Sequence, residues 1–137
     1  IKLEKRSKLN LKKTFTIFFK NINSLKIRLM KTLIKLKKKG KSIHGYGAST
    51  KGNVLLQYFN INQNFLDYIS DRNPKKNNCY TPGTNIKILT EAKSRSLKPD
   101  YYLVLPWHFR REILKREINI RRKGTRFIFP LPILKII

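Results

Sequence analysis

The chain is poor in acidic residues and in cysteine. Seven Asp and Glu stand against 32 Lys and Arg in 137 residues, which gives a net charge of +25. The lone cysteine, Cys79, excludes a disulfide within the chain and any cysteine-rich metal site that the chain could form alone, so we expect a reducing, cytoplasmic compartment. No apolar run approaches the roughly 18 residues that cross a bilayer, and we therefore expect no membrane partner.

The excess of positive charge makes a polyanion a candidate partner. The basic residues are mostly Lys, however, and they accompany abundant Asn and Ile. That bias can reflect the coding background of the source organism rather than selection for binding. Nucleic acid therefore stays an alternative partner, and the length fits one domain with a core of its own.

The N-terminal region combines a basic composition with a helical pattern. Residues 1–39 carry 14 Lys or Arg against the lone Glu4. Residues 1–14 lack a clear stripe, and we expect a basic, poorly ordered segment there, followed by a domain over residues 15–137. Apolar residues then recur at steps of three and four, which predicts an amphipathic helix carrying Phe15, Phe18, Ile22, Leu25, Leu29, Leu33 and Leu36. We interpret its stripe as packing on the domain; docking of its lysines on nucleic acid or membrane is the alternative.

From residue 41 onward, short apolar runs alternate with helical patterns, which is typical of a parallel α/β sheet. The sequence predicts about five strands with helices on both faces. The expected strands cover residues 42–46, 65–70, 86–89, 101–105 and 126–129, and the expected helices cover 51–59, 91–96 and 107–117.

A glycine-rich turn joins the first expected strand to the first helix. Gly45 and Gly47 allow a ligand to approach the main chain, and N–H groups at the helix start would face a phosphate. Ser49 would cap the helix or donate its hydroxyl, and Lys51 would add a positive charge. The segment lacks the full G-x-G-x-x-G fingerprint and is not a Walker A loop, so a plain strand-to-helix connection remains the alternative.

Two further loops follow the carboxyl ends of expected strands, where open α/β sheets bind ligands. Asp71 would accept hydrogen bonds from ribose hydroxyls and Arg72 would clamp a phosphate; a turn that satisfies its own backbone is the alternative. Trp107 would stack on a base or sugar, His108 would exchange a proton, and Arg110 would bind phosphate. The alternative here is that Trp107 packs in the core and His108 caps a helix.

Four motifs in this order resemble the C-terminal domain of sugar C-methyltransferases. They are GYGASTKGNVLL at 45–56, DRNP at 71–74, YTPGT at 80–84 and LPWHFRREI at 105–113. The resemblance covers roughly residues 15–132. It implies a Rossmann-like fold that helps to hold a nucleotide-linked keto-sugar. In that family, zinc and S-adenosylmethionine bind in other domains, which also carry the catalytic groups for methyl transfer to a sugar carbon.

The resemblance leads to a specific set of expectations. The chain would be a fragment that binds a nucleotide-linked sugar, without a catalytic residue, metal ligand or cofactor of its own, and the missing methyltransferase domains would be partners in cis or in trans. The alternative function is a basic α/β nucleic-acid-binding module. The expected substrate-binding residues are Tyr46, Gly47, Ser49, Lys51, Asp71, Arg72, Trp107, His108 and Arg110.

Overall fold

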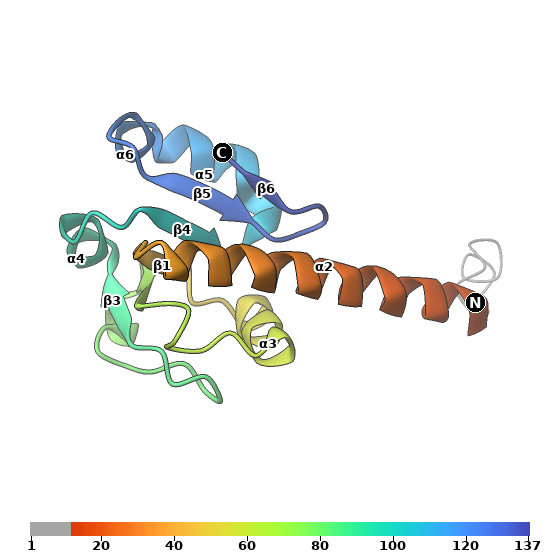
Figure 1. Cartoon of the computed structure of the whole chain (residues 1–137). Helices are drawn as coiled ribbons and strands as arrows, with labels where there is room; N and C mark the ends of the chain where they lie inside the picture. The colour runs from red at the N-terminus through yellow and green to blue at the C-terminus, as the bar shows by residue number, and fades with distance from the viewer. Residues whose placement is uncertain (1–11) are drawn as a thin grey trace.

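The computed structural model describes residues 12–137 of the chain. These residues build a six-stranded, mostly parallel sheet with helices packed against it (Figure 1). The strand order is β3-β2-β1-β4-β5-β6; the first five strands pair in parallel, and β6 pairs antiparallel with β5. The strands are β1 (Ile43–Tyr46), β2 (Tyr68–Asp71), β3 (Ile88–Thr90), β4 (Tyr101–Val104), β5 (Arg126–Phe129) and β6 (Lys135–Ile136). The predicted α/β class and mostly parallel sheet are confirmed.

The strand bounds differ from the prediction by one residue at β1 and at β4 and by more at β2 and β3; β3 covers Ile88–Thr90 instead of residues 86–89. Residues 65–67 form a turn rather than strand, because the N–H groups of Phe65 and Leu66 donate to the Asn62 carbonyl, and β2 begins at Tyr68. The antiparallel strand β6 was not predicted. It is two residues long and follows two prolines, which interrupt regular structure.

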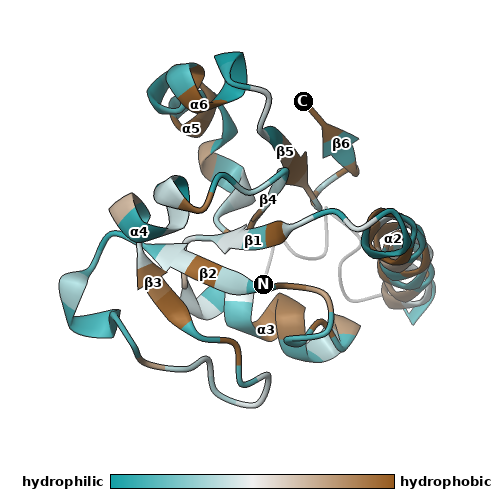
Figure 2. Ribbon diagram, turned by 60° about the vertical axis from the view of Figure 1, so that its left-hand side comes forward, coloured by the Kyte–Doolittle hydropathy of each residue, from teal (hydrophilic) through white to brown (hydrophobic). Residues whose placement is uncertain are grey.

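Helices cover both faces of the sheet, as Figure 2 shows. Helices α2 and α3 lie on one face, and α4, α5 and α6 lie on the other. The helices are α2 (Lys12–Lys38), α3 (Thr50–Phe59), α4 (Glu91–Ser96), α5 (Arg110–Arg116) and α6 (Ile118–Arg122), with short 3-10 turns at Pro74–Lys76 and Trp107–Phe109. The helix expected over 107–117 is thus divided into a 3-10 turn and α5.

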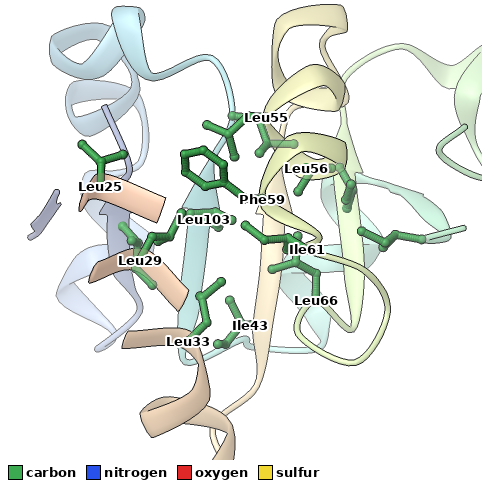
Figure 3. Close-up of a cluster of buried hydrophobic side chains, with 14 of the residues drawn as sticks. Leu25, Leu29, Leu33, Ile43, Leu55, Leu56, Phe59, Ile61, Leu66 and Leu103 are labelled. Carbon is green, nitrogen blue, oxygen red and sulfur yellow. The ribbon is translucent and has the colours of Figure 1, made fainter. Parts of the chain in front are cut away.

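Each face of the sheet has its own apolar core, because neighbouring residues of a strand point to opposite faces. Ile43 and Leu103 face α2 and α3, where Leu29 and Leu56 pack against them (Figure 3). On the other face, an aromatic group packs under α5 and α6: Tyr46, Tyr102, Phe127 and Phe129. The strands are therefore apolar on both sides, as is usual for a parallel sheet.

Helix α2 contacts the domain through only part of its length. Leu25, Leu29 and Leu33 are buried, whereas Phe15 and Phe18 are exposed on the N-terminal half, which extends past the sheet (Figure 1). Residues 12–14, which we expected in a poorly ordered segment, are helical, and the rest of that segment, residues 1–11, lies outside the described residues. No helix within residues 12–137 combines the length and apolar character needed to span a membrane.

Candidate functional site

A crevice opens at the carboxyl edge of the sheet, between the ends of β1 and β4. These neighbouring strands lead to opposite faces, since β1 continues into α3 and β4 continues into α5. Ligands of open α/β sheets bind at such a switch in direction. The crevice has a volume of about 490 Å³ and is lined by Tyr46, Gly47, Ala48, Ser49, Asp71, Arg72, Lys76, Glu91, Pro106, Phe109, Glu112, Ile113 and Arg116.

The glycine-rich turn forms one wall of the crevice. Gly47 has a φ of +81°, and a Cβ added there would lie 3.0 Å from the Cδ atom of Pro106. A Cβ at Gly52 would lie only 2.5 Å from the Cβ of Leu105, so the absence of a side chain lets α3 pack closely against the end of β4. Glycine is therefore required at both positions, once for backbone conformation and once for close packing.

The N–H groups of this turn bind acceptors of the protein itself. The Ala48 N–H donates to Asp71 Oδ2 at 2.7 Å, and the Gly47 N–H donates to the Ser70 carbonyl at 2.7 Å. Ser49 caps α3, because its Oγ accepts the Gly52 N–H at 3.1 Å. The sequence predicted N–H groups that face a phosphate. Here, a phosphate at Ala48 would first have to displace the Asp71 carboxylate.

Asp71 organises the loop that follows β2. Its second oxygen accepts the Asn73 N–H at 2.8 Å, and Lys76 Nζ lies 3.5 Å from Oδ2 while donating to the Ala48 carbonyl at 2.8 Å. Asn73 in turn accepts the N–H of Lys75. The side chain of Asp71 therefore fastens the two loops to each other, which corresponds to the turn-forming alternative that we considered for this residue.

A cluster of charges around the buried carboxylate of Glu117 supports the base of the crevice. Glu117, only 2% exposed, accepts hydrogen bonds from the Tyr46 hydroxyl at 2.7 Å, from Arg95 Nη2 at 2.6 Å and from Arg116 Nε at 3.0 Å. Arg116 also contacts the Tyr46 hydroxyl and Glu91, and Arg95 contacts Glu91. Two carboxylates thus balance two guanidinium groups, which is the condition for keeping charges inside a protein.

The surroundings of Glu117 and Tyr46 in this cluster determine their protonation states. Burial alone would raise the pKa of Glu117, but the hydrogen bonds from Arg95 and Tyr46 and the two guanidinium charges lower it overall, so this carboxylate is ionised. Burial, and then the hydrogen bond to Glu117, raise the pKa of the Tyr46 phenol. Tyr46 is therefore a neutral hydrogen-bond donor at the base of the crevice.

The structure brings five of the nine expected site residues together. Tyr46, Gly47, Ser49, Asp71 and Arg72 all line the crevice.

The other four lie elsewhere. Lys51 and Trp107 line a separate apolar groove of about 310 Å³ between α2 and α3. His108 is exposed, with its ring centroid 4.2 Å from that of Phe109, and Arg110 begins α5; neither lines the crevice. No side chain caps the start of the 3-10 turn or of α5, so the helix-capping role considered for His108 does not occur.

Several lining residues were not found from the sequence. Phe109, Glu112, Ile113 and Arg116 recur at steps of three and four, which puts them on one face of a helix. That spacing could have identified them as a group. Lys76, from the 3-10 turn after β2, has no such local signal.

A larger cavity, of about 900 Å³, lies at the opposite edge of the sheet. Asp100 and Thr125, which precede β4 and β5, belong to its lining. Both have structural roles, since Asp100 accepts hydrogen bonds from Ser42 and Lys41, and the Thr125 hydroxyl donates to the Pro99 carbonyl. Because ligands of α/β sheets bind at the carboxyl ends of the strands, the crevice is the better candidate site.

The described residues do not fit a metal ion. Within residues 12–137, no three His, Cys, Asp or Glu side chains lie close enough to share one. His44 is buried, and its Nδ1 lies 2.8 Å from the Ser94 hydroxyl. Burial lowers the pKa of His44 to about 4, so its imidazole is neutral and structural.

Comparison with known proteins identifies the family to which the chain belongs. Residues 1–132 match the family described as the C-methyltransferase C-terminal domain. The chain is also 36% identical, over 98 residues, to the C-methyltransferase NovU of Streptomyces niveus. The match covers 72% of this chain and 23% of that relative, so the chain spans only a small part of the relative's length. The chain belongs to the C-methyltransferase C-terminal domain family.

Proposed function

We propose that the crevice binds a nucleotide-linked sugar, and that the chain is the substrate-side domain of a sugar C-methyltransferase. One observation carries the proposal: the loops after β1, β2 and β4 meet in a crevice at the switch in strand direction. The first five strands have the order of a dinucleotide-binding sheet, which supports a Rossmann-like assignment. A relative that is itself a C-methyltransferase supports the reaction class.

The lining offers the kinds of groups that such a ligand needs. Arg72 and Lys76 provide positive charge for a diphosphate. The Tyr46 hydroxyl lies at the base, and Phe109 adds an aromatic surface. An apolar surface with a few convergent polar groups is the usual composition of a small-molecule site.

Methyl transfer itself would require parts of the enzyme beyond this chain. S-adenosylmethionine would supply an electrophilic methyl group, and we propose that it and zinc bind in the portion of the enzyme that the chain does not span. Within residues 12–137, no cluster of His, Cys, Asp or Glu side chains could hold a metal ion. The backbone N–H groups of residues 47–49 already donate hydrogen bonds to acceptors of the protein itself. Alone, the chain would bind the sugar substrate without turning it over.

The charge of the crevice does not favour the nucleic-acid alternative. Three carboxylates, Asp71, Glu91 and Glu112, face three cations, Arg72, Lys76 and Arg116. The crevice is therefore neutral overall in a chain whose net charge is +25. A polyanion would be better bound by the exposed lysines of α2, outside the crevice.

Binding and turnover can be tested on the same sample. Calorimetric titration of the 137-residue chain with dTDP-glucose should give saturable binding, and incubation with radiolabelled S-adenosylmethionine and a nucleotide-linked keto-sugar should give no labelled product. The absence of binding would reject the proposed ligand. Turnover by the chain alone would reject the assignment to the substrate side.

A further inference from the structure

Glu112 differs from the other acids that the structure describes. Residues 12–137 contain six, and five of them bind protein groups: Asp67, Asp71, Glu91, Asp100 and Glu117. Glu112 alone among them has neither a hydrogen bond nor an ion pair with a described residue. Glu112 is exposed, so its carboxylate is accessible to a ligand in the crevice.

Glu112 lies in the wall of the crevice beside an exposed aromatic ring. It occupies the first turn of α5, and Phe109, three residues earlier, is 52% exposed. Both residues line the crevice. The helix that carries them is held in place, because Ile113 is buried in the aromatic core and Arg116 is bonded to Glu117. Glu112 and Phe109 are therefore presented to the crevice by a fixed element.

This pair has the chemistry of a sugar-binding surface. An ionised carboxylate only accepts hydrogen bonds, and it can accept them from two neighbouring hydroxyls. An aromatic ring covers the apolar C–H face of a sugar ring. Across the crevice, the oxygens of Asp71 are already occupied by the N–H groups of Ala48 and Asn73. Glu112 is the lining carboxylate that remains open to ligand hydroxyls.

We propose that Glu112 and Phe109 bind the sugar ring of the nucleotide-linked substrate and thereby distinguish it from the free nucleotide. The inference rests on the proposed function. Glu112 accepts hydrogen bonds from ring hydroxyls, and Phe109 packs on the ring. The nucleotide diphosphate lies toward Arg72 and Lys76, on the opposite wall.

The test compares dTDP-glucose with dTDP, which lacks the sugar and carries an additional negative charge on its terminal phosphate, so the change of the affinity ratio on substitution is the readout. Calorimetry should show that the wild-type chain binds dTDP-glucose about tenfold more tightly than dTDP. Glu112→Gln and Phe109→Ala should each remove most of that difference by weakening dTDP-glucose, while the affinity for dTDP changes by less than about twofold. Arg111→Gln is the matched control, since Arg111 is exposed on α5 and does not line the crevice.

The outcomes separate this inference from the proposed function. A carboxylate in the first turn of a helix also interacts favourably with the helix dipole. If Glu112 had only this structural role, its substitution would change the affinities for both ligands equally or change neither. Equal binding of the two ligands by the wild type, or an unchanged ratio in Glu112→Gln and Phe109→Ala, overturns the inference and leaves nucleotide binding intact. If neither ligand binds the wild type, the proposed function fails, and the inference fails with it.

Discussion

The Tyr46 hydroxyl donates a 2.7 Å hydrogen bond to the buried carboxylate of Glu117. This bond joins the end of β1 to the end of α5, 71 residues apart along the chain. Arg95, which lies in α4, donates a hydrogen bond to the same carboxylate. The base of the crevice therefore depends on one acid that three elements share.

Loss of that acid should destabilise the fold. Glu117→Gln leaves Glu91 as the one carboxylate that balances Arg95 and Arg116, and we expect a loss of about 3 kcal/mol in the free energy of unfolding. The value lies at the lower end for a broken buried pair because both guanidinium groups are partly exposed. Urea denaturation at neutral pH measures it. Glu112→Gln is the control and should change stability by less than about 0.5 kcal/mol; equal effects of the two changes would contradict this account of the cluster.

His44 should make stability fall in mild acid. Its folded pKa is about 4 against an ordinary value of 6.5, because burial disfavours the imidazolium. Below pH 6.5 the unfolded chain binds a proton that the folded chain does not, so the free energy of unfolding decreases as the pH falls toward 4. The total loss should be at most about 3 kcal/mol.

Denaturation curves measured across this range check the effect. His44→Gln should flatten the pH dependence of the unfolding free energy in the upper part of this pH range, where carboxylates do not yet titrate. His108→Gln should leave it unchanged, because that side chain is exposed. A slope that survives in His44→Gln would mean that another group binds the proton.

Shortening an apolar side chain to alanine should change the free energy of unfolding differently in the two halves of α2. Leu29 is fully buried against the sheet, and Leu29→Ala should cost about 2–4 kcal/mol in unfolding free energy. Phe18 is 60% exposed on the half that extends past the sheet, and Phe18→Ala should cost less than about 1 kcal/mol. Thermal or urea unfolding distinguishes the two. A large loss in Phe18→Ala would indicate that this half of α2 packs on the domain in solution.

Arg72 should contribute to phosphate binding. If it contacts the diphosphate, Arg72→Ala should weaken binding of dTDP-glucose and of dTDP alike, on the order of tenfold or more. Lys93→Ala removes an exposed charge of α4 outside the crevice and should leave both affinities unchanged. Equal weakening by the two substitutions would point to general electrostatic attraction, which added salt would suppress.

Most of the fold could be predicted because its strands and helices correspond to local patterns of apolar residues in the sequence. The apolar run before Pro130 and the short helix after Thr90 were placed at their observed bounds. The site was harder to predict. That Asp71 would bind the Ala48 N–H depends on the packing of β2 beside β1, which no local pattern encodes. Likewise, Trp107 follows a strand end as expected, but its side chain lines the groove beside α3 instead of the crevice.

An NMR titration of the isotope-labelled chain with dTDP-glucose tests the central claim most directly. We expect saturable shifts of the amide signals of Gly47, Arg72 and Glu112, which lie on different walls of the crevice, while those of Lys37, Lys38 and Lys39 on the α2 side change little. Shifts spread along α2, with none at the three crevice residues, would contradict the account and favour a nonspecific polyanion surface.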